Sequence, residues 1–88
     1  MDIFDLTGKV AIITGGNGGL GLGIARGLAK AGASVAISGR SQEKLDSAAA
    51  QLRNEGFKVL PIRADVSVEE DVNRMVRETA EHFGRVDI

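Results

Sequence analysis

Short apolar runs alternate along the chain with longer stretches in which apolar residues recur every three or four positions. The runs lie at residues 9–14, 34–38 and 58–63, and they are nearly continuous in apolar and β-branched residues. Runs of this kind are typical of parallel strands that are covered on both faces. Pro61 has no amide hydrogen to donate, so the third run is expected at an edge of the sheet.

The stretches that follow the runs predict three helices, each with one apolar face. The first helix is expected to end at Gly32 and the second at Gly56, because glycine tolerates the left-handed backbone of a helix end. Ser41 is the predicted N-cap of the second helix. The third helix is expected to open at a capping box formed by Ser67 and Glu70. The predicted apolar faces consist of Leu20, Ile24, Leu28 and Ala31, of Leu45, Ala48, Ala49 and Leu52, and of Val68, Val72, Met75, Val76, Thr79, Ala80 and Phe83.

Strand and helix thus alternate three times, and the final residues, VDI at 86–88, look like the start of a fourth strand. Such alternation with short loops predicts right-handed βαβ units and a parallel sheet. The expected fold class is α/β: the N-terminal half of a Rossmann-like, doubly wound parallel sheet, with the order βαβαβα plus the beginning of a fourth strand. We expect residues 1–88 to form one segment of a larger single domain, truncated where that strand begins.

The stretch TGGNGGLGLG, residues 14–23, holds six of the chain's twelve glycines. It joins the first predicted strand to the first predicted helix, at the sheet edge where open α/β folds bind ligands. A pyrophosphate can lie there against the free amides of the helix N-terminus if side chains are absent. Gly15 would make the turn, Gly19 would admit the pyrophosphate and Gly21 would let the helix pack on the sheet. The alternatives are a merely flexible loop, and a P-loop, which is excluded because its Gly-Lys-Ser/Thr ending is missing.

Composition excludes several classes of function. The chain has 88 residues, a net charge of −1 and no segment dominated by Lys and Arg, which argues against binding of nucleic acid. It has no cysteine, which excludes disulfides and cysteine-based metal sites. His82 is its one histidine, so no pair of histidines could share a metal ion, and we expect no metal site. The acidic N-terminus, the lack of cysteine and the lack of an apolar run of membrane-spanning length together predict a cytoplasmic protein.

Three motifs of the chain resemble those of the short-chain dehydrogenases/reductases. TGGNGGLG matches that family's Thr-Gly-x-x-x-Gly-x-Gly motif, whose fixed positions are here Thr14, Gly15, Gly19 and Gly21. ADVS, at 64–67, resembles the loop after the family's third strand, and FGRVDI resembles the entry to its fourth strand. The likeness is greatest to the reductases that act on sugar acids and on 3-oxoacyl thioesters.

This resemblance implies an oxidoreductase that moves a hydride between a nicotinamide cofactor and an alcohol or ketone. It implies that Asp65 contacts the adenine amino group and that Val66 lies beside the adenine ring. The family's chemistry uses a tyrosine as general acid, together with a lysine, a serine and an asparagine. The chain contains no tyrosine, so no catalytic residue is assigned. The resemblance also implies a homo-oligomer, namely a tetramer.

The end of the second predicted strand favours NADP over NAD. An acidic residue there would accept a hydrogen bond from the ribose of NAD and repel a 2′-phosphate, but the chain has Gly39 at that position. Arg40 follows, and its guanidinium suits a phosphate, with Ser38 and Ser41 as further donors. The alternative is that Arg40 is only a solvated residue at the start of a helix.

Two positions in the glycine-rich stretch bear on the same choice. Many NADP-preferring relatives carry a basic residue where this chain has Gly18, so Arg40 alone carries the preference. Asn17 either touches a phosphate or caps the turn. The full set of expected cofactor-binding residues is Gly15, Asn17, Gly18, Gly19, Leu20, Gly21, Ser38, Arg40, Ser41, Asp65 and Val66.

Two functions of different classes fit the sequence. The first is the cofactor-binding part of an NADP-dependent oxidoreductase whose substrate is a small carbonyl compound or alcohol, and the isolated chain would then be inactive. The second is a stand-alone nucleotide-binding module without catalytic activity. The reading frame beyond Ile88 separates them, since the enzyme would continue into an Asn-Asn-Ala-Gly motif and later a Tyr-x-x-x-Lys motif.

Overall fold

The computed structural model describes residues 5–15 and 19–88. Strands and helices alternate within them in the predicted order βαβαβα. The elements are β1 (Val10–Thr14), α1 (Gly19–Lys30), β2 (Ser34–Gly39), α2 (Gln42–Asn54), β3 (Val59–Arg63) and α3 (Glu69–Phe83). The predicted Rossmann-like fold class is therefore confirmed. None of the described helices is long and apolar enough to cross a membrane.

The three strands form one parallel sheet in the order β1-β2-β3. Thr14 is level with Ser38, and Ser38 is level with Ile62, so the carboxyl ends of all three strands meet at one edge. Pro61 lies on β3, which is an edge strand of the described sheet, as its missing amide hydrogen predicted.

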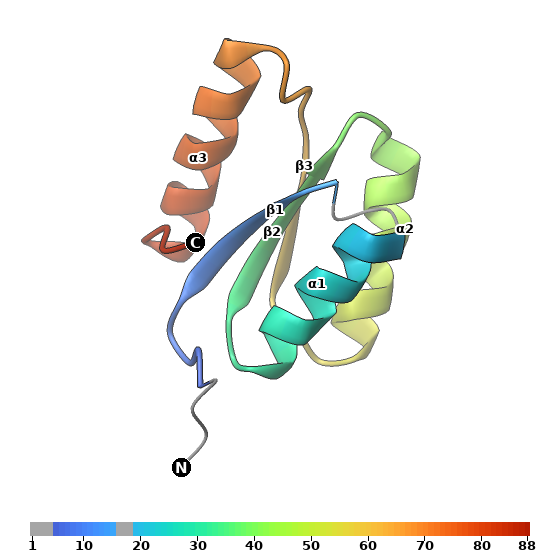
Figure 1. The fold of residues 1–88 in the computed structure, drawn as a ribbon, viewed down its shortest axis with the longest axis vertical. Helices are drawn as coiled ribbons and strands as arrows, with labels where there is room; N and C mark the ends of the chain where they lie inside the picture. Colours follow the sequence, from blue (N-terminus) through green and yellow to red (C-terminus); the bar gives the residue numbers. More distant parts are fainter. Residues whose placement is uncertain (1–4, 16–18) are drawn as a thin grey trace.

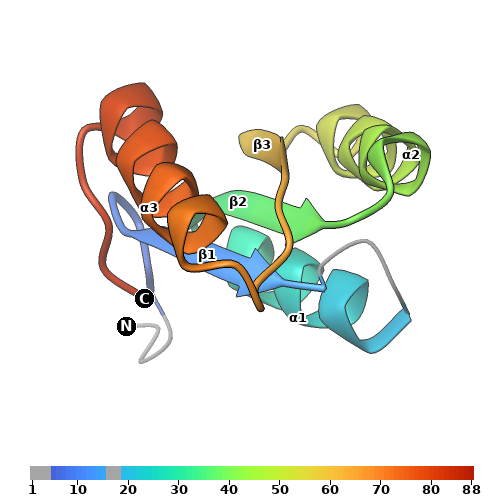
Figure 2. The same cartoon turned by 90° about the horizontal axis from the view of Figure 1, so that it is seen from above.

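Helices cover both faces of the sheet (Figure 1). Seen from above in Figure 2, α1 and α2 lie on one side of the strands and α3 on the other. Alternate residues of β2 serve the two faces: Val35 and Ile37 join the core under α1 and α2, whereas Ala36 joins the core under α3. This double burial explains why the strand sequences are apolar without alternation.

The ends of two helices test the capping predictions. Ser41 caps α2 as predicted, since its Oγ accepts a hydrogen bond of 3.3 Å from the amide of Lys44. The predicted capping box of α3 is wrong: Val68 is the N-cap and contributes no side-chain bond. The hydroxyl of Ser67 instead donates to Oδ1 of Asp65 at 2.7 Å. The helix begins one residue later than the capping box requires, so Ser67 lies before the N-cap.

The predicted apolar faces of α1 and α3 are wider than the faces that are buried. Ile24 of α1 is 49% exposed and Val76 of α3 is 43% exposed. The buried residues of α1 include the small Ala25 and Ala29, which let its backbone approach the sheet. Periodicity identified the inward side of α2 and α3, but in α1 the buried residues Ala25 and Ala29 are not among those predicted.

The C-terminal residues lie along the edge of β1 that faces away from β2. The amides of Asp87 and Ile88 donate to the carbonyl of Val10 at 2.8 and 3.1 Å, and the amide of Ile12 donates to the carbonyl of Ile88 at 3.0 Å. Residues 85–88 form no strand, although they occupy the place where a fourth strand was expected to begin. Both edges of β1 therefore have partners.

Candidate functional site

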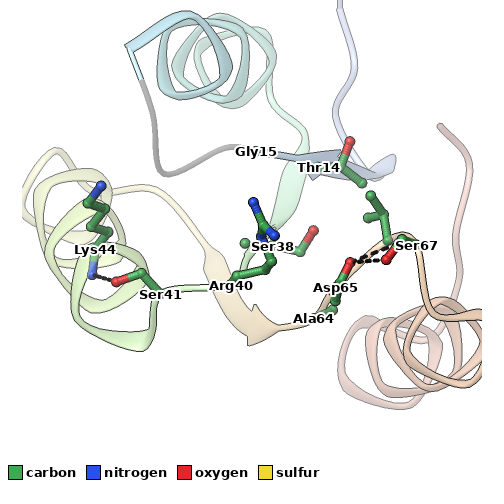
Figure 3. Close-up of a pocket in the computed structure, with 11 residues that line it drawn as sticks. Thr14, Gly15, Ser38, Arg40, Ser41, Lys44, Ala64, Asp65 and Ser67 are labelled. Carbon is green, nitrogen blue, oxygen red and sulfur yellow. Dashed lines mark hydrogen bonds between the residues drawn. The ribbon is translucent and has the colours of Figure 1, made fainter.

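A cavity of about 750 Å³ opens at the carboxyl edge of the sheet. Its walls come from the end of β1, the β2–α2 connection with the start of α2, and the loop between β3 and α3 (Figure 3). The lining residues are Thr14, Gly15, Ser38, Gly39, Arg40, Ser41, Lys44, Ala64, Asp65, Val66 and Ser67. This is the edge at which open α/β sheets bind their ligands.

The cavity brings together most of the predicted site residues that lie in the described part of the chain. Gly15, Ser38, Arg40, Ser41, Asp65 and Val66 all line it, although they come from three separate segments. Gly19, Leu20 and Gly21 form the beginning of α1. Asn17 and Gly18 lie outside the described residues.

Gly15 makes the turn out of β1. Its φ is +69°, a left-handed value that a residue with a side chain adopts only with strain. Its amide donates a hydrogen bond of 2.8 Å to the carbonyl of Ser38. Gly15 therefore still pairs with β2 through its amide, while its φ is one that favours glycine.

One end of the cavity is cationic. Arg40 follows β2 and Lys44 lies in the first turn of α2; in Figure 3 both side chains extend to the same side of the connection between them. Neither cation forms an ion pair among the described residues. The N-terminus of α2 adds its partial positive charge here. Sequence reasoning missed Lys44, although its position three residues after the N-cap Ser41 was a usable signal.

The opposite end of the cavity is anionic, because it holds Asp65. Oδ1 of Asp65 accepts hydrogen bonds from the hydroxyl of Ser67 at 2.7 Å and from its amide at 2.9 Å. These bonds, and to a smaller extent the charge of Arg40, hold the pKa of Asp65 below its ordinary value. Asp65 is therefore an ionised acceptor at neutral pH.

Between the two ends, Ser38 offers a buried hydroxyl. Its side chain is 1% exposed, and its Oγ has no hydrogen-bond partner among the described residues. Burying a polar group without a partner costs about 1–3 kcal/mol.

The cavity holds neither a metal-binding cluster nor an aromatic or imidazole proton donor among the described residues. Among the described residues there is no group of three or more His, Cys, Asp or Glu side chains that could hold a metal ion. The lining set contains hydroxyl, cationic and carboxylate groups but no histidine or tyrosine, the usual proton donors at neutral pH.

Comparison with known proteins gives consistent results. The sequence profile of the short chain dehydrogenase family matches residues 9–88. The chain is 44% identical over 81 residues to a peroxisomal 2,4-dienoyl-CoA reductase of Arabidopsis thaliana, covering 92% of the chain and 27% of the relative. It is 39% identical over 89 residues to a 2-dehydro-3-deoxy-D-gluconate 5-dehydrogenase of Formosa agariphila, covering 100% of the chain and 34% of the relative.

Solved structures show the same likeness. A short-chain type dehydrogenase/reductase from Mycobacterium marinum superposes with a TM-score of 0.93 at 40% identity, over 98% of this chain and 35% of that one. A hydroxysteroid dehydrogenase from Escherichia coli superposes with a TM-score of 0.91 at 29% identity, over 99% of this chain and 37% of that one. The chain therefore spans about a third of the length of the proteins that it resembles.

Proposed function

Because the chain belongs to the short-chain dehydrogenase/reductase family, we propose that it is the cofactor-binding part of an NADP-dependent oxidoreductase. The nicotinamide of the cofactor would supply or accept the hydride, and the substrate would be a small alcohol or carbonyl compound. In this proposal residues 1–88 form the N-terminal part of a single domain, and the catalytic groups lie in a further part of the protein.

The observation that carries the proposal is the polarity of the cavity. Its cationic end, with Arg40 and Lys44, suits an anion, and its anionic end, with Asp65, suits a hydrogen-bond donor. An adenosine with a 2′-phosphate presents both groups: a dianionic phosphate on the ribose and an amino group on the base. Val66, which is 56% exposed, would give the base an apolar surface to lie on.

The choice of NADP over NAD rests on the end of β2. Gly39 has no carboxylate that could accept from a ribose 2′-hydroxyl or repel a phosphate. Arg40 presents a planar set of donors beside it, and Ser41 stands at the N-terminus of α2. The pyrophosphate would lie near Gly15 and the first amides of α1, where backbone donors are free.

Competition binding tests this proposal directly. The protein expressed from its complete reading frame is titrated with NADPH and with NADH, and each is displaced by adenosine 2′,5′-bisphosphate or by ADP. We expect NADPH and the 2′-phosphorylated fragment to bind at least tenfold more tightly than their counterparts, the scale of one charge-assisted hydrogen bond. Equal affinities would contradict the NADP preference, and no binding of any of the four would contradict the function itself.

A stand-alone nucleotide-binding module is the second candidate. The reading frame beyond Ile88 decides between the two. An enzyme would continue with a tyrosine and a lysine four positions apart, whereas a stop codon would favour the module. The curated relatives act on a dienoyl thioester in one case and on a sugar acid in another, so we propose the substrate only as a class.

A further inference from the structure

A side chain of α3 holds the backbone of the loop that carries Asp65. The amide of Asp65 donates a hydrogen bond of 2.9 Å to Oδ2 of Asp71, six residues further along the chain. The last bond between the β2 and β3 segments is the one from the amide of Ala64 to the carbonyl of Gly39, at 2.9 Å. The Asp71 carboxylate therefore binds the backbone amide of Asp65, the first residue after the last backbone bond of the sheet.

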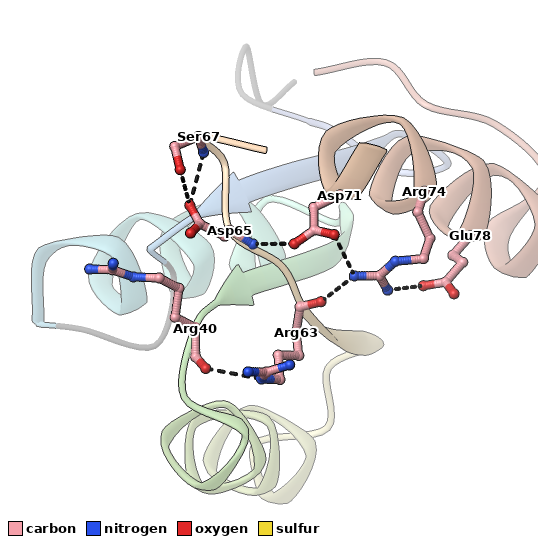
Figure 4. A network of polar contacts seen from close by, with 7 residues as sticks. All are labelled: Arg40, Arg63, Asp65, Ser67, Asp71, Arg74 and Glu78. Atoms are coloured by element: carbon pink, nitrogen blue, oxygen red, sulfur yellow. Dashed lines mark hydrogen bonds and ion pairs between the residues drawn. The ribbon is translucent and has the colours of Figure 1, made fainter. Parts of the chain in front are cut away.

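Arg74 holds the same loop from its other end. Its NH2 group donates a hydrogen bond of 2.6 Å to the carbonyl of Arg63, and it lies 3.7 Å from Oδ1 of Asp71 (Figure 4). The NH1 group of Arg74 lies 3.4 Å from Glu78, which fixes the guanidinium from behind. Two adjacent turns of α3 thus bind the carbonyl of residue 63 and the amide of residue 65.

The contacts extend to the cationic end of the cavity. Nε of Arg63 donates a hydrogen bond of 3.2 Å to the carbonyl of Arg40. The backbone segments that present Arg40 and Asp65 are consequently connected to one another through Arg63, and to α3 through Arg74 and Asp71. Figure 4 shows these contacts running without a break from Arg40 to Asp65.

We propose that Asp71 and Arg74 are positioning residues, which hold the 63–67 loop so that the Asp65 carboxylate is aimed at the adenine amino group. This inference rests on the proposed function. Ser67 occupies Oδ1 of Asp65, and Oδ2 has no hydrogen bond within the described part of the chain. Because one oxygen is already committed, the direction of the other is set by the loop backbone, which Asp71 and Arg74 hold.

The ion pair between Asp71 and Arg74 adds little to the stability of the fold. The side chains of Arg74 and Asp71 are 36% and 33% exposed, and half-exposed ion pairs contribute little to stability. Glu69 and Glu70 lie in the same first turn of α3 and have the same favourable interaction with the helix dipole. Among these three acids, Asp71 is the one whose carboxylate binds the loop. Glu70 therefore offers a matched control.

The test compares NADPH with its hypoxanthine analogue, in which a carbonyl replaces the adenine amino group. Dissociation constants are measured for both with the protein expressed from its complete reading frame. The wild type should prefer adenine by about tenfold, as expected for one hydrogen bond to a charged group. Asp71→Ala should reduce this preference to about twofold or less, because Asp65 loses its fixed direction. Asp71→Asn keeps an acceptor for the Asp65 amide and should retain most of the preference.

Two further variants make the result specific. Glu70→Gln removes a charge from the same helical turn and should leave the adenine preference unchanged. Arg74→Met removes the contact with the Arg63 carbonyl and should lower the preference in the same direction as Asp71→Ala, so the inference stays testable if one variant does not fold. Circular dichroism establishes which variants are folded.

The outcomes separate this inference from the function on which it rests. If Asp71→Ala weakens both cofactors equally and leaves the adenine preference intact, Asp71 has a structural role only and the inference is overturned. A wild type that binds both cofactors without distinguishing them would also overturn it, while cofactor binding would stand. A wild type that binds neither would refute the proposed function.

Discussion

The amide of Gly15 donates a hydrogen bond of 2.8 Å to the carbonyl of Ser38, and this bond joins the carboxyl ends of β1 and β2 at the wall of the cavity. Gly15 also has a positive φ, +69°, in the first residue after the strand. Gly15 therefore makes both the turn at the cavity and the hydrogen bond that joins the ends of β1 and β2.

The substitution Gly15→Ala should destabilise the protein by about 1–2 kcal/mol, the cost of a left-handed backbone for a residue with a side chain. A Cβ at this position would meet no atom within 4 Å, so backbone strain and not a steric clash is the expected cause. Urea unfolding monitored by circular dichroism measures the change. Gly23→Ala is the control: a Cβ there also meets nothing within 4 Å, and position 23 is helical. This control should stabilise the protein by about 0.5–1 kcal/mol. A loss of stability for both variants would exclude the conformational explanation.

Arg40→Ala should weaken NADPH binding by about 1.5–3 kcal/mol and leave NADH binding nearly unchanged, because the guanidinium is proposed to contact only the 2′-phosphate. Isothermal titration with both cofactors measures the two changes. Arg53→Ala is a suitable control, since Arg53 lies at the far end of α2 and its NH2 group donates to the carbonyl of Val59. Equal losses of NADPH and NADH affinity on Arg40→Ala would contradict the phosphate role.

Ser67→Ala should change the pH dependence of stability in a defined direction. Hydrogen bonds from Ser67 lower the pKa of Asp65 in the folded state, so they stabilise the fold when Asp65 is ionised. The stability difference between wild type and Ser67→Ala should be present above about pH 4, near the unfolded pKa of an aspartate. It should shrink as the pH falls through the lower folded pKa of Asp65. Urea unfolding at pH values from neutral down to about 2 measures it, and a difference that grows as the pH falls would contradict this assignment.

The sequence predicted the features that are encoded locally. The strands from residues 9, 34 and 58 were found to within one residue at each end, because buried parallel strands have continuous apolar runs that need no knowledge of their neighbours. The Ser41 cap was found for the same reason, since the donor is three residues away. The edge position of Pro61 followed from its missing amide hydrogen.

Features that depend on competition or on distant neighbours were not found. The capping box at Ser67 failed because the turn that follows Asp65 puts Val68, one residue later, at the N-cap, and Ser67 bonds to Asp65 instead. The roles suggested here for Lys44 and Asp71 depend on how loops from different strands lie against one another, which periodicity does not report. Ile24 was placed in a buried face and is 49% exposed, because a hydrophobic stripe does not say how much of its width is covered.

The placement of the cationic end of the cavity outside both cores has a consequence for how such a protein can change. Arg40, Ser41 and Lys44 belong to neither core cluster, whereas Val35 and Ile37, a few residues earlier on β2, are fully buried. Substitutions at Arg40 and Lys44 therefore create no internal void and expose no core residue, so they should cost little folding stability. Ser41 differs, because its side chain caps α2. If the proposed function holds, cofactor choice can change at Arg40 and Lys44 while the layered framework is retained.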